Sequence, residues 1–403
     1  MTSFATSRLT QVELSPTYAL LDKVHQLRRS GVDVLDLGSG EPDFDTPDHI
    51  KQAAHEALAA GQTHYTPSRG DACLLQALAD KLRRDNSIDV DPQQGLIVTP
   101  SAKHALFISL LGALRPGDEV IIPTPCWPSY LAMIRIAGGV PVALPLQSTD
   151  GWRLTQAAIE TKRSDRTRAV LINTPTNPTG RVLTLDELEA VAEFAQRHDL
   201  LIIADEIYEK LVYCAARHIS IASLPAAAQR TLTVNGFSKS YAMTGWRLGY
   251  VAGPPSLMGD LLKLQQHSVG CAGSFVQAGG RAALLGDQEP IAEMSRTYLS
   301  RMRLIVEGLN SVPGFSCRSV EGSFYAFASV AGTGFPTSAE LAAWLLDEAH
   351  VALTPGSAFG PGGEGHVRLS FATSAETIDK AIDRMCKALR HRQSQPRLDG
   401  ASA

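Results

Sequence analysis

A lysine in a short loop is the residue of this chain best suited to covalent chemistry. The stretch Ser238-Lys239-Ser240 lies between two apolar runs, Thr231–Val234 and Leu248–Ala252, and Arg247 follows the lysine by eight residues. An amine that forms a Schiff base needs a protected, fixed site, and a nearby cation if its partner carries a phosphate. The alternative is a solvated surface lysine, although hydroxyl and aromatic side chains flank this one.

Two further segments, each directly after an apolar run, contain groups that could bind an anion or a ring oxygen. Pro100-Ser101-Ala102-Lys103 opens a predicted helix, where small residues leave backbone N–H groups available to an anion. An ordinary helix capped by Ser101 is the alternative. In Thr174–Gly180, two prolines and a glycine fix a turn from which Asn177 would donate to a ring oxygen, unless it is a plain turn residue.

Asp205 ends another apolar run and Tyr208 follows it by three residues. A carboxylate at the end of a buried strand needs a positive or donating partner, and a protonated pyridine nitrogen would be one. Tyr208 would reach the neighbouring ring hydroxyl; an N-capping aspartate with a packing tyrosine is the alternative.

Trp127 would stack on a planar ring or pack in the core. Arg368, in the apolar run Val367–Phe371, needs an anionic partner or a solvated face.

The elements that position these residues alternate between strands and helices. Near-continuous apolar strands separated by helices, such as Lys103–Leu114 and Leu185–His198, are typical of a parallel sheet with both faces covered. The last two runs are too close for a helical crossover, so the final strand is predicted to be antiparallel. Ligands of such sheets bind at the carboxyl ends of the strands. The predicted strands are Leu96–Thr99, Val120–Pro123, Pro141–Leu146, Ala169–Asn173, Leu200–Ala204, Thr231–Val234 and Gly249–Ala252.

After about Gly286 the pattern changes to long helices with short strands, which predicts a separate α+β domain. Its predicted elements are the helices Glu289–Leu309 and Ser338–His350 and the strands Phe324–Phe327 and Val367–Phe371. We expect the segment before about Thr46 to pack on this domain. The predicted division is an N-terminal arm and small-domain segment at 1–45, a large cofactor domain at 46–285, a small domain at 286–390 and a flexible tail at 391–403.

Composition excludes several classes of protein. The 403 residues are 44% hydrophobic and 19% charged with a net charge of −4, which indicates a globular chain without a nucleic-acid or membrane partner. The six cysteines form no CxxC pair, so neither a metal site nor a disulfide framework is expected. Met1–Leu20 does not resemble a signal peptide, and no run reaches about 18 apolar residues. A cytoplasmic location is therefore predicted.

An anion nest, a ring-oxygen donor, a ring-nitrogen carboxylate, a Schiff-base lysine and a phosphate-binding arginine together meet the needs of pyridoxal 5'-phosphate. The chain resembles the class I aminotransferases, which are fold type I pyridoxal-phosphate enzymes, and within them the bacterial aspartate aminotransferase subgroup. The resemblance implies a seven-stranded, mostly parallel sheet with helices on both faces and a smaller α+β domain. The stretches that carry it are Gly40–Pro47, Tyr65–Pro67, Asn177–Gly180, Asp205–Tyr208, Ser238–Tyr250 and His366–Ser370.

The resemblance also implies a role for each site residue. Lys239 would hold the cofactor as a Schiff base and act as the base at the substrate's Cα. Asp205 would contact the ring nitrogen, and Asn177 and Tyr208 the ring hydroxyl. The phosphate would be bound by Ser238, Arg247, the backbone of Ala102 and Lys103, and Tyr65 of the other subunit of a homodimer. Trp127 would stack on the ring, and Arg368, with Asn177 and the Gly40 backbone, would bind the α-carboxylate.

The substrate follows from the resemblance less directly. A lysine at the position of Lys103 helps to bind a dicarboxylic side chain in the similar subgroup, with Ser15 or Thr17 nearby, which favours aspartate and 2-oxoglutarate. Glu13 replaces a basic residue associated with prephenate, and Arg69 is either a second anion-binding group or a surface residue. The alternatives are an arginine, alanine or aromatic aminotransferase that uses pyruvate, a carbon–sulfur β-lyase, or a binding protein without turnover.

Overall fold

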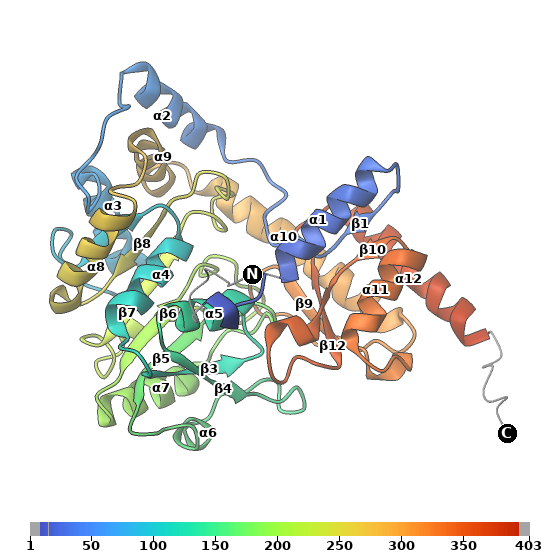
Figure 1. The fold of residues 1–403 in the computed structure, drawn as a ribbon. Coiled ribbons are helices and arrows are strands. Elements are labelled where there is room, and N and C mark those ends of the chain that lie inside the picture. The colour runs from blue at the N-terminus through green and yellow to red at the C-terminus, as the bar shows by residue number, and fades with distance from the viewer. Residues whose placement is uncertain (1–8, 15, 395–403) are drawn as a thin grey trace, which may run out of the picture.

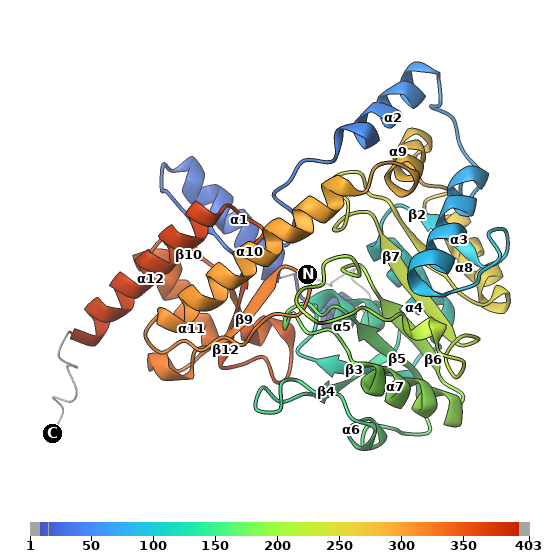
Figure 2. The same ribbon diagram turned by 180° about the vertical axis from the view of Figure 1, so that it is seen from behind.

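The protein folds into two lobes. The structure, a computed structural model, describes residues 9–14 and 16–394, so Ser15 lies outside the described residues. One lobe contains the largest sheet, and the other is built from the two chain ends (Figure 1). Helix α10 (Glu289–Ser311) runs from the first lobe into the second (Figure 2). None of the helices in the described ranges is both long and apolar enough to cross a membrane.

The large sheet has seven strands, as predicted. All neighbouring strands are parallel except β8, which is antiparallel to β7 and to β2. The predicted strands lie within one or two residues of the observed ones. In their spatial order these are β2 (Leu96–Thr99), β8 (Gly249–Ala252), β7 (Thr231–Gly236), β6 (Leu201–Asp205), β5 (Thr167–Asn173), β3 (Glu119–Thr124) and β4 (Val140–Pro145).

Both faces of this sheet are covered because its strands are apolar on both sides. In β5, Ala169 and Leu171 pack toward α4 and α5, whereas Val170 and Ile172 pack toward α6 and α7. Near β2 and β8, α2, α3 and α9 cover the sheet. The helices of this lobe are α2 (Asp48–Ala59), α3 (Ala72–Asn86), α4 (Ala102–Ala113), α5 (Pro128–Ile136), α6 (Gln156–Glu160), α7 (Leu185–Arg197), α8 (Pro255–Ser268) and α9 (Ser274–Leu285).

The second lobe combines two small sheets with helices from both ends of the chain. The antiparallel strands are β11 (Thr354–Pro355), β12 (His366–Ser370) and β9 (Tyr325–Ser329), and β1 (Leu35–Asp36) pairs with β10 (Val351–Ala352). The helices are α1 (Pro16–Arg29), α11 (Ser338–Glu348) and α12 (Ala375–Ser394). The segment before Thr46 contacts this lobe, where Val24 and Val34 pack against Leu346 and Ala352.

Helix α12 extends beyond residue 390, the predicted end of the small domain. It continues to Ser394, so residues 391–394 of the predicted tail are helical, and residues 395–403 lie outside the described ranges. His391 and Arg392 occupy the last turn, where cations interact favourably with the helix dipole. The Arg392 guanidinium also lies 4.0 Å from the centre of the Phe335 ring. These contacts favour the additional helical turn.

The sheet topology brings the ends of distant segments to one edge. Strands β2, β3, β5, β6 and β7 run in the same direction, so their carboxyl ends share that edge. Strand β8 runs the other way, so Arg247, just before it, lies at the same edge as Lys239, just after β7. This edge faces the second lobe, which contributes residues to the cavity between them.

Candidate active site

A cavity of about 570 Å³ lies at this edge of the sheet. Its walls come from the strand ends of the first lobe and from α1, β9 and β12 of the second. All but one of the predicted site residues line it, and the exception is Tyr65. Those lining it are Thr17, Gly40, Ala102, Lys103, Trp127, Asn177, Asp205, Tyr208, Ser238, Lys239, Arg247 and Arg368.

Lys239 extends its amine into this cavity. The Nζ atom donates a hydrogen bond to the backbone oxygen of Gly40 and lies 5.7 Å from the centre of the Phe324 ring. Burial, with a smaller effect of the positive charges of Arg368, Arg247 and Lys103, lowers the pKa of Lys239 to about 8 against the opposing effect of Glu41. A lysine with this pKa has a substantial neutral fraction near neutral pH, as a nucleophile or base requires.

Asp205 is the last residue of β6 and is 3% exposed. The Tyr130 hydroxyl donates to its Oδ2 atom at 2.7 Å, and the backbone N–H of Ile207 donates to Oδ1 at 3.1 Å. Burial nevertheless raises the pKa of Asp205 to about 6. A cation in the cavity beside this carboxylate would favour its ionised form.

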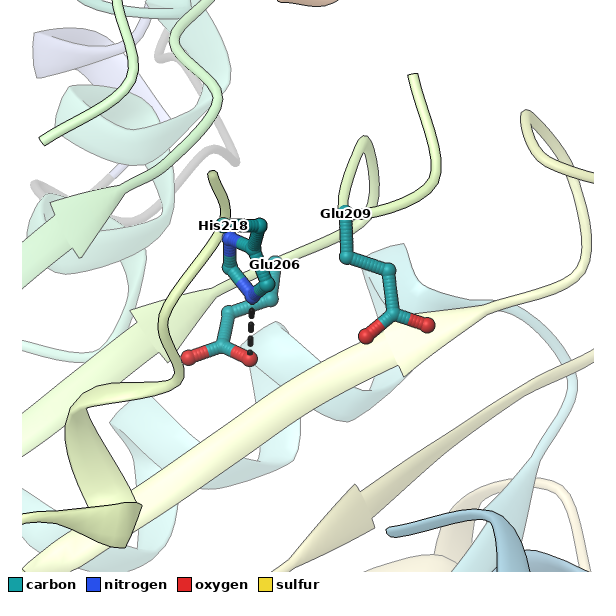
Figure 3. A group of neighbouring side chains, drawn as sticks. All are labelled: Glu206, Glu209 and His218. Carbon is teal, nitrogen blue, oxygen red and sulfur yellow. Dashed lines mark hydrogen bonds and ion pairs between the residues drawn. The ribbon is translucent and has the colours of Figure 1, made fainter. Parts of the chain in front are cut away.

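A second polar cluster is formed by Glu206, which follows Asp205 in the sequence, with Glu209 and His218 (Figure 3). Their potential ligand atoms lie within 4.8 Å of one another, and such groups bind metals in other proteins. Here, however, the His218 Nε2 atom pairs with Glu206 Oε2 at 3.1 Å, and the Lys81 ammonium pairs with Glu209. Burial is the largest single cause and lowers the pKa of His218, but the carboxylates of Glu206 and Glu209 together raise it, and the net pKa is raised.

These pairs make the cluster a buried ion-pair network, in which Glu206 Oε1 and His218 Nδ1 have no hydrogen-bond partner among the described residues. Successive side chains along an extended backbone point to opposite sides, which separates Glu206 from Asp205. The sequence-based expectation of no metal site stays a prediction.

The start of α4, where an anion site is predicted, is a capped helix N-terminus at the cavity. Ser101 caps the helix by accepting from the His104 N–H at 3.3 Å, which leaves the N–H groups of Ala102 and Lys103 available to an anion. Its φ of 105° is rare for a residue other than glycine. The helix start also crowds β8, because a Cβ added to Gly249 would lie 2.2 Å from the Ala102 nitrogen. Glycine at this position therefore allows the N–H groups of Ala102 and Lys103 to lie close to the sheet edge.

Arg368 is almost entirely buried, with 2% of its surface exposed. Its Nη1 atom donates to Asn177 Oδ1 at 3.1 Å and its Nη2 atom to the Gly38 oxygen at 2.7 Å. The Nε atom has no hydrogen-bond partner among the described residues. Because the Asn177 amide oxygen is engaged, its amide nitrogen remains the group that can donate to a ring oxygen.

Lys103 supplies a further cation at the cavity. Its Nζ atom lies 5.1 Å from the centre of the Trp127 ring and 5.3 Å from that of Tyr18. Both distances are in the range of cation–π attraction. Among residues 9–14 and 16–394, no acidic side chain forms an ion pair with Lys103, Arg247 or Arg368. The cavity thus presents cationic groups that an anionic ligand can pair with.

Three residues discussed from the sequence, Glu13, Tyr65 and Arg69, do not line this cavity. Tyr65 is 95% exposed, which leaves its predicted contact with a second subunit a prediction. Arg69 donates to the backbone oxygen of Leu96 at 2.8 Å and does not line the cavity. In this chain, Arg69 therefore supports the backbone of β2.

Sequence reasoning missed three tyrosines that line the cavity: Tyr18, Tyr130 and Tyr325. Tyr130 lies one helical turn after Trp127, so helical spacing offered a signal for it. Tyr18 and Tyr325 reach the cavity through the packing of the second lobe. No local sequence pattern predicts that packing.

Comparison with known proteins places the chain in a family. Residues 32–385 match the family described as aminotransferase class I and II. The chain belongs to this family. It is a pyridoxal-phosphate-dependent transaminase, as the sequence motifs predicted.

The relatives of this chain are named for different substrates. An aspartate aminotransferase of Musicola paradisiaca is 47% identical over 382 residues, which cover 95% of this chain and 96% of that protein. An aromatic-amino-acid aminotransferase of Thermococcus litoralis is 41% identical, covering 92% and 95%. The crystal structure of Thermus thermophilus aspartate aminotransferase with maleate has a TM-score of 0.91 at 39% identity, covering 96% of this chain and 100% of that one.

The residues of this aminotransferase fit the cofactor. Asp205 is a buried carboxylate that a protonated ring nitrogen would complement, and Arg247 and the α4 start are suited to a phosphate. The Lys239 amine extends into the same space. The donor set thus matches an aldehyde, a basic ring nitrogen and a phosphate.

We predict that Gly249→Ala weakens binding of the cofactor phosphate. The added methyl group would displace the Ala102 nitrogen and with it the anion site, which should lower the affinity for pyridoxal phosphate by about tenfold or more. Titration of the cofactor-free enzyme with pyridoxal phosphate measures this. Gly259→Ala is the control, since an added Cβ there meets nothing within 4 Å; equal affinities in the two variants would contradict the prediction.

We also predict that covalent incorporation of the cofactor depends on pH with a midpoint near 8. Only the neutral amine attacks an aldehyde, and the neutral fraction of Lys239 increases as the pH rises through its pKa of about 8. The rate in the cofactor-free enzyme should therefore rise with pH and level off above this value. Stopped-flow absorbance provides the measurement, with Nα-acetyl-lysine as the reference. A midpoint as high as that of the reference, about 10.4, would exclude the lowered pKa.

Proposed function

We propose that this aminotransferase transfers the amino group of L-aspartate to 2-oxoglutarate. The observation that carries the proposal is that one cavity contains both Arg368 and Lys103, neither paired with an acidic side chain among the described residues. Two carboxylates of a dicarboxylic substrate would complement these two cations. The relatives named aspartate aminotransferase and the Thermus structure with maleate, a dicarboxylate, support it.

In this proposal the chain's residues divide the work between binding and proton transfer. Arg368 binds the α-carboxylate, and Lys103 attracts the distal one. Lys239 Nζ, when neutral, takes the proton from the substrate's Cα. Asp205 keeps the ring nitrogen of the cofactor protonated, while Asn177 and Tyr208 donate to the ring oxygen. When bound, the cofactor supplies an aldehyde that accepts the amino group and a ring that takes up negative charge.

The remaining contacts complete the cofactor site. We propose that Ser238, Arg247 and the N–H groups of Ala102 and Lys103 bind the phosphate, and that Trp127 stacks on the ring. The protein would act as a homodimer, in which Tyr65 reaches the phosphate in the other subunit; the exposure of Tyr65 on a single chain supports this. The division at residues 46 and 286 would separate the cofactor domain from the small domain, with Thr17 near the distal carboxylate.

Aromatic amino acids are a second candidate class of donor. The Lys103 ammonium lies against the rings of Trp127 and Tyr18, so part of the cavity wall is aromatic. An aromatic side chain would pack against these rings. The relative from Thermococcus litoralis that is named for aromatic amino acids supports this candidate.

We predict that aspartate changes the visible absorbance of the bound cofactor and that 2-oxoglutarate restores it. Lys239→Ala should reduce this exchange by at least about 100-fold, because the variant lacks the amine that moves the proton. A panel of amino acids against pyruvate, oxaloacetate and 2-oxoglutarate ranks the donors. Release of ammonia in place of amino transfer, or full exchange in Lys239→Ala, would contradict the proposal.

We predict that Lys103→Ala lowers kcat/KM for aspartate by about 10- to 100-fold, the value of a lost charge-assisted hydrogen bond. Alanine, which lacks the distal carboxylate, should be affected much less. Steady-state kinetics with both donors measure the difference, and Lys263→Ala, an exposed lysine on α8, is the matched control. Equal losses for aspartate and alanine would remove Lys103 from substrate selection.

A further inference from the structure

Tyr325 lines the cavity and has no role in the reaction as described so far. It is the first residue of β9 and is 1% exposed. Its hydroxyl lies 3.1 Å from the hydroxyl of Tyr208, within hydrogen-bonding distance. The same hydroxyl is 3.1 Å from the position that a Cβ on Gly40 would occupy. Tyr325 therefore links the second lobe to the cofactor side of the cavity.

The ring of Tyr325 contacts the arginine that faces the substrate. The Arg368 guanidinium carbon lies 4.3 Å from the centre of the Tyr325 ring and 5.0 Å from that of Phe359. The strand register explains the first contact: Phe327 pairs with Arg368, and Tyr325, two residues earlier in β9, shares that face of the sheet. Two aromatic rings thus restrict the guanidinium, in addition to its hydrogen bonds.

We propose that Tyr325 is a positioning residue with two separable roles. Its hydroxyl orients the Tyr208 phenol toward the ring oxygen of the cofactor, and its ring fixes the Arg368 guanidinium for the substrate carboxylate. The proposal rests on the functions proposed above for Tyr208 and Arg368.

The first role follows from the limited hydrogen-bonding capacity of a phenol. A tyrosine hydroxyl has one proton to donate and lone pairs that accept. If Tyr325 donates to Tyr208, the proton of Tyr208 is directed elsewhere, into the cavity that both residues line. Without this partner, Tyr208 would divide its proton between competing orientations. The two hydroxyls therefore form a chain that ends at the cofactor ring.

The second role follows from the burial of Arg368. The guanidinium has hydrogen bonds through both terminal nitrogen atoms, but it pairs with no acidic group among the described residues. The negative face of an aromatic ring stabilises such a desolvated cation and limits its rotation. The ring of Tyr325 would thus keep the guanidinium aligned before the substrate arrives.

Two substitutions separate these roles from simple packing. Tyr325→Phe removes the hydroxyl and keeps the ring, and Tyr325→Leu removes both. Tyr298→Phe, at a buried tyrosine that does not line the cavity, is the control. Each variant is purified with its cofactor, and two quantities are measured: the pH midpoint of the cofactor's visible absorbance change and the KM for the best amino donor.

Tyr325→Phe should raise the pH midpoint by about one unit, because a donor to the ring oxygen favours its ionised form, and should leave KM within about twofold. Tyr325→Leu should raise the midpoint similarly and also raise KM by about tenfold. Tyr298→Phe should change neither. An unchanged midpoint in Tyr325→Phe, or equal KM values in the phenylalanine and leucine variants, would overturn the corresponding role. The absorbance titration needs no substrate, so it is independent of whether aspartate is the donor.

Discussion

The removal of water from charged groups around one cavity is the constraint on which this structure depends. Asp205 and Arg368 are 3% and 2% exposed, and burial moves the pKa values of Asp205 and Lys239 to about 6 and 8. Each shift shows that the folded chain disfavours the ordinary charged form of the side chain. A ligand with a cationic ring nitrogen and anionic groups offsets these costs, whereas a neutral apolar ligand does not. Binding of the cofactor therefore offsets part of the desolvation cost of these buried groups, and this contributes to its affinity.

Both lobes are needed to build this arrangement. Asp205, Lys239 and Asn177 come from the edge of the large sheet, and Arg368 and Tyr325 come from the small antiparallel sheet. The hydrogen bond between Arg368 and Asn177 joins the two lobes within the cavity itself. Lys239 and the Gly40 oxygen make a second such contact, because Gly40 follows β1 of the second lobe. A change in the packing of the lobes would therefore alter substrate binding and proton transfer together.

The sequence revealed the first lobe more completely than the second. Apolar runs with polar residues at their ends predicted all seven strands, and the rule that ligands bind at carboxyl ends brought Asn177, Asp205 and Lys239 together. It did not reveal Tyr325, because the register between β9 and β12 depends on tertiary packing. Nor did it assign Arg69, whose bond to the Leu96 oxygen depends on the path of the chain before α3. The role of a residue that acts through a partner distant in sequence is not indicated by any local sequence pattern.

The chemistry of the site is fixed more firmly than its choice of substrate. Asp205 and Arg368 are each held by at least two hydrogen bonds in the protein interior. Lys103 is restrained instead by cation–π contacts, one of them with Tyr18, whose surface is 58% exposed. Exposed contacts of this kind contribute about 0.5–1 kcal/mol, so substitutions there change the cavity mouth at little cost in stability. The family includes relatives named for aspartate and for aromatic amino acids. This agrees with the contrast between buried and exposed groups, since substitutions at α1 can change the selectivity while the buried groups keep the same reaction.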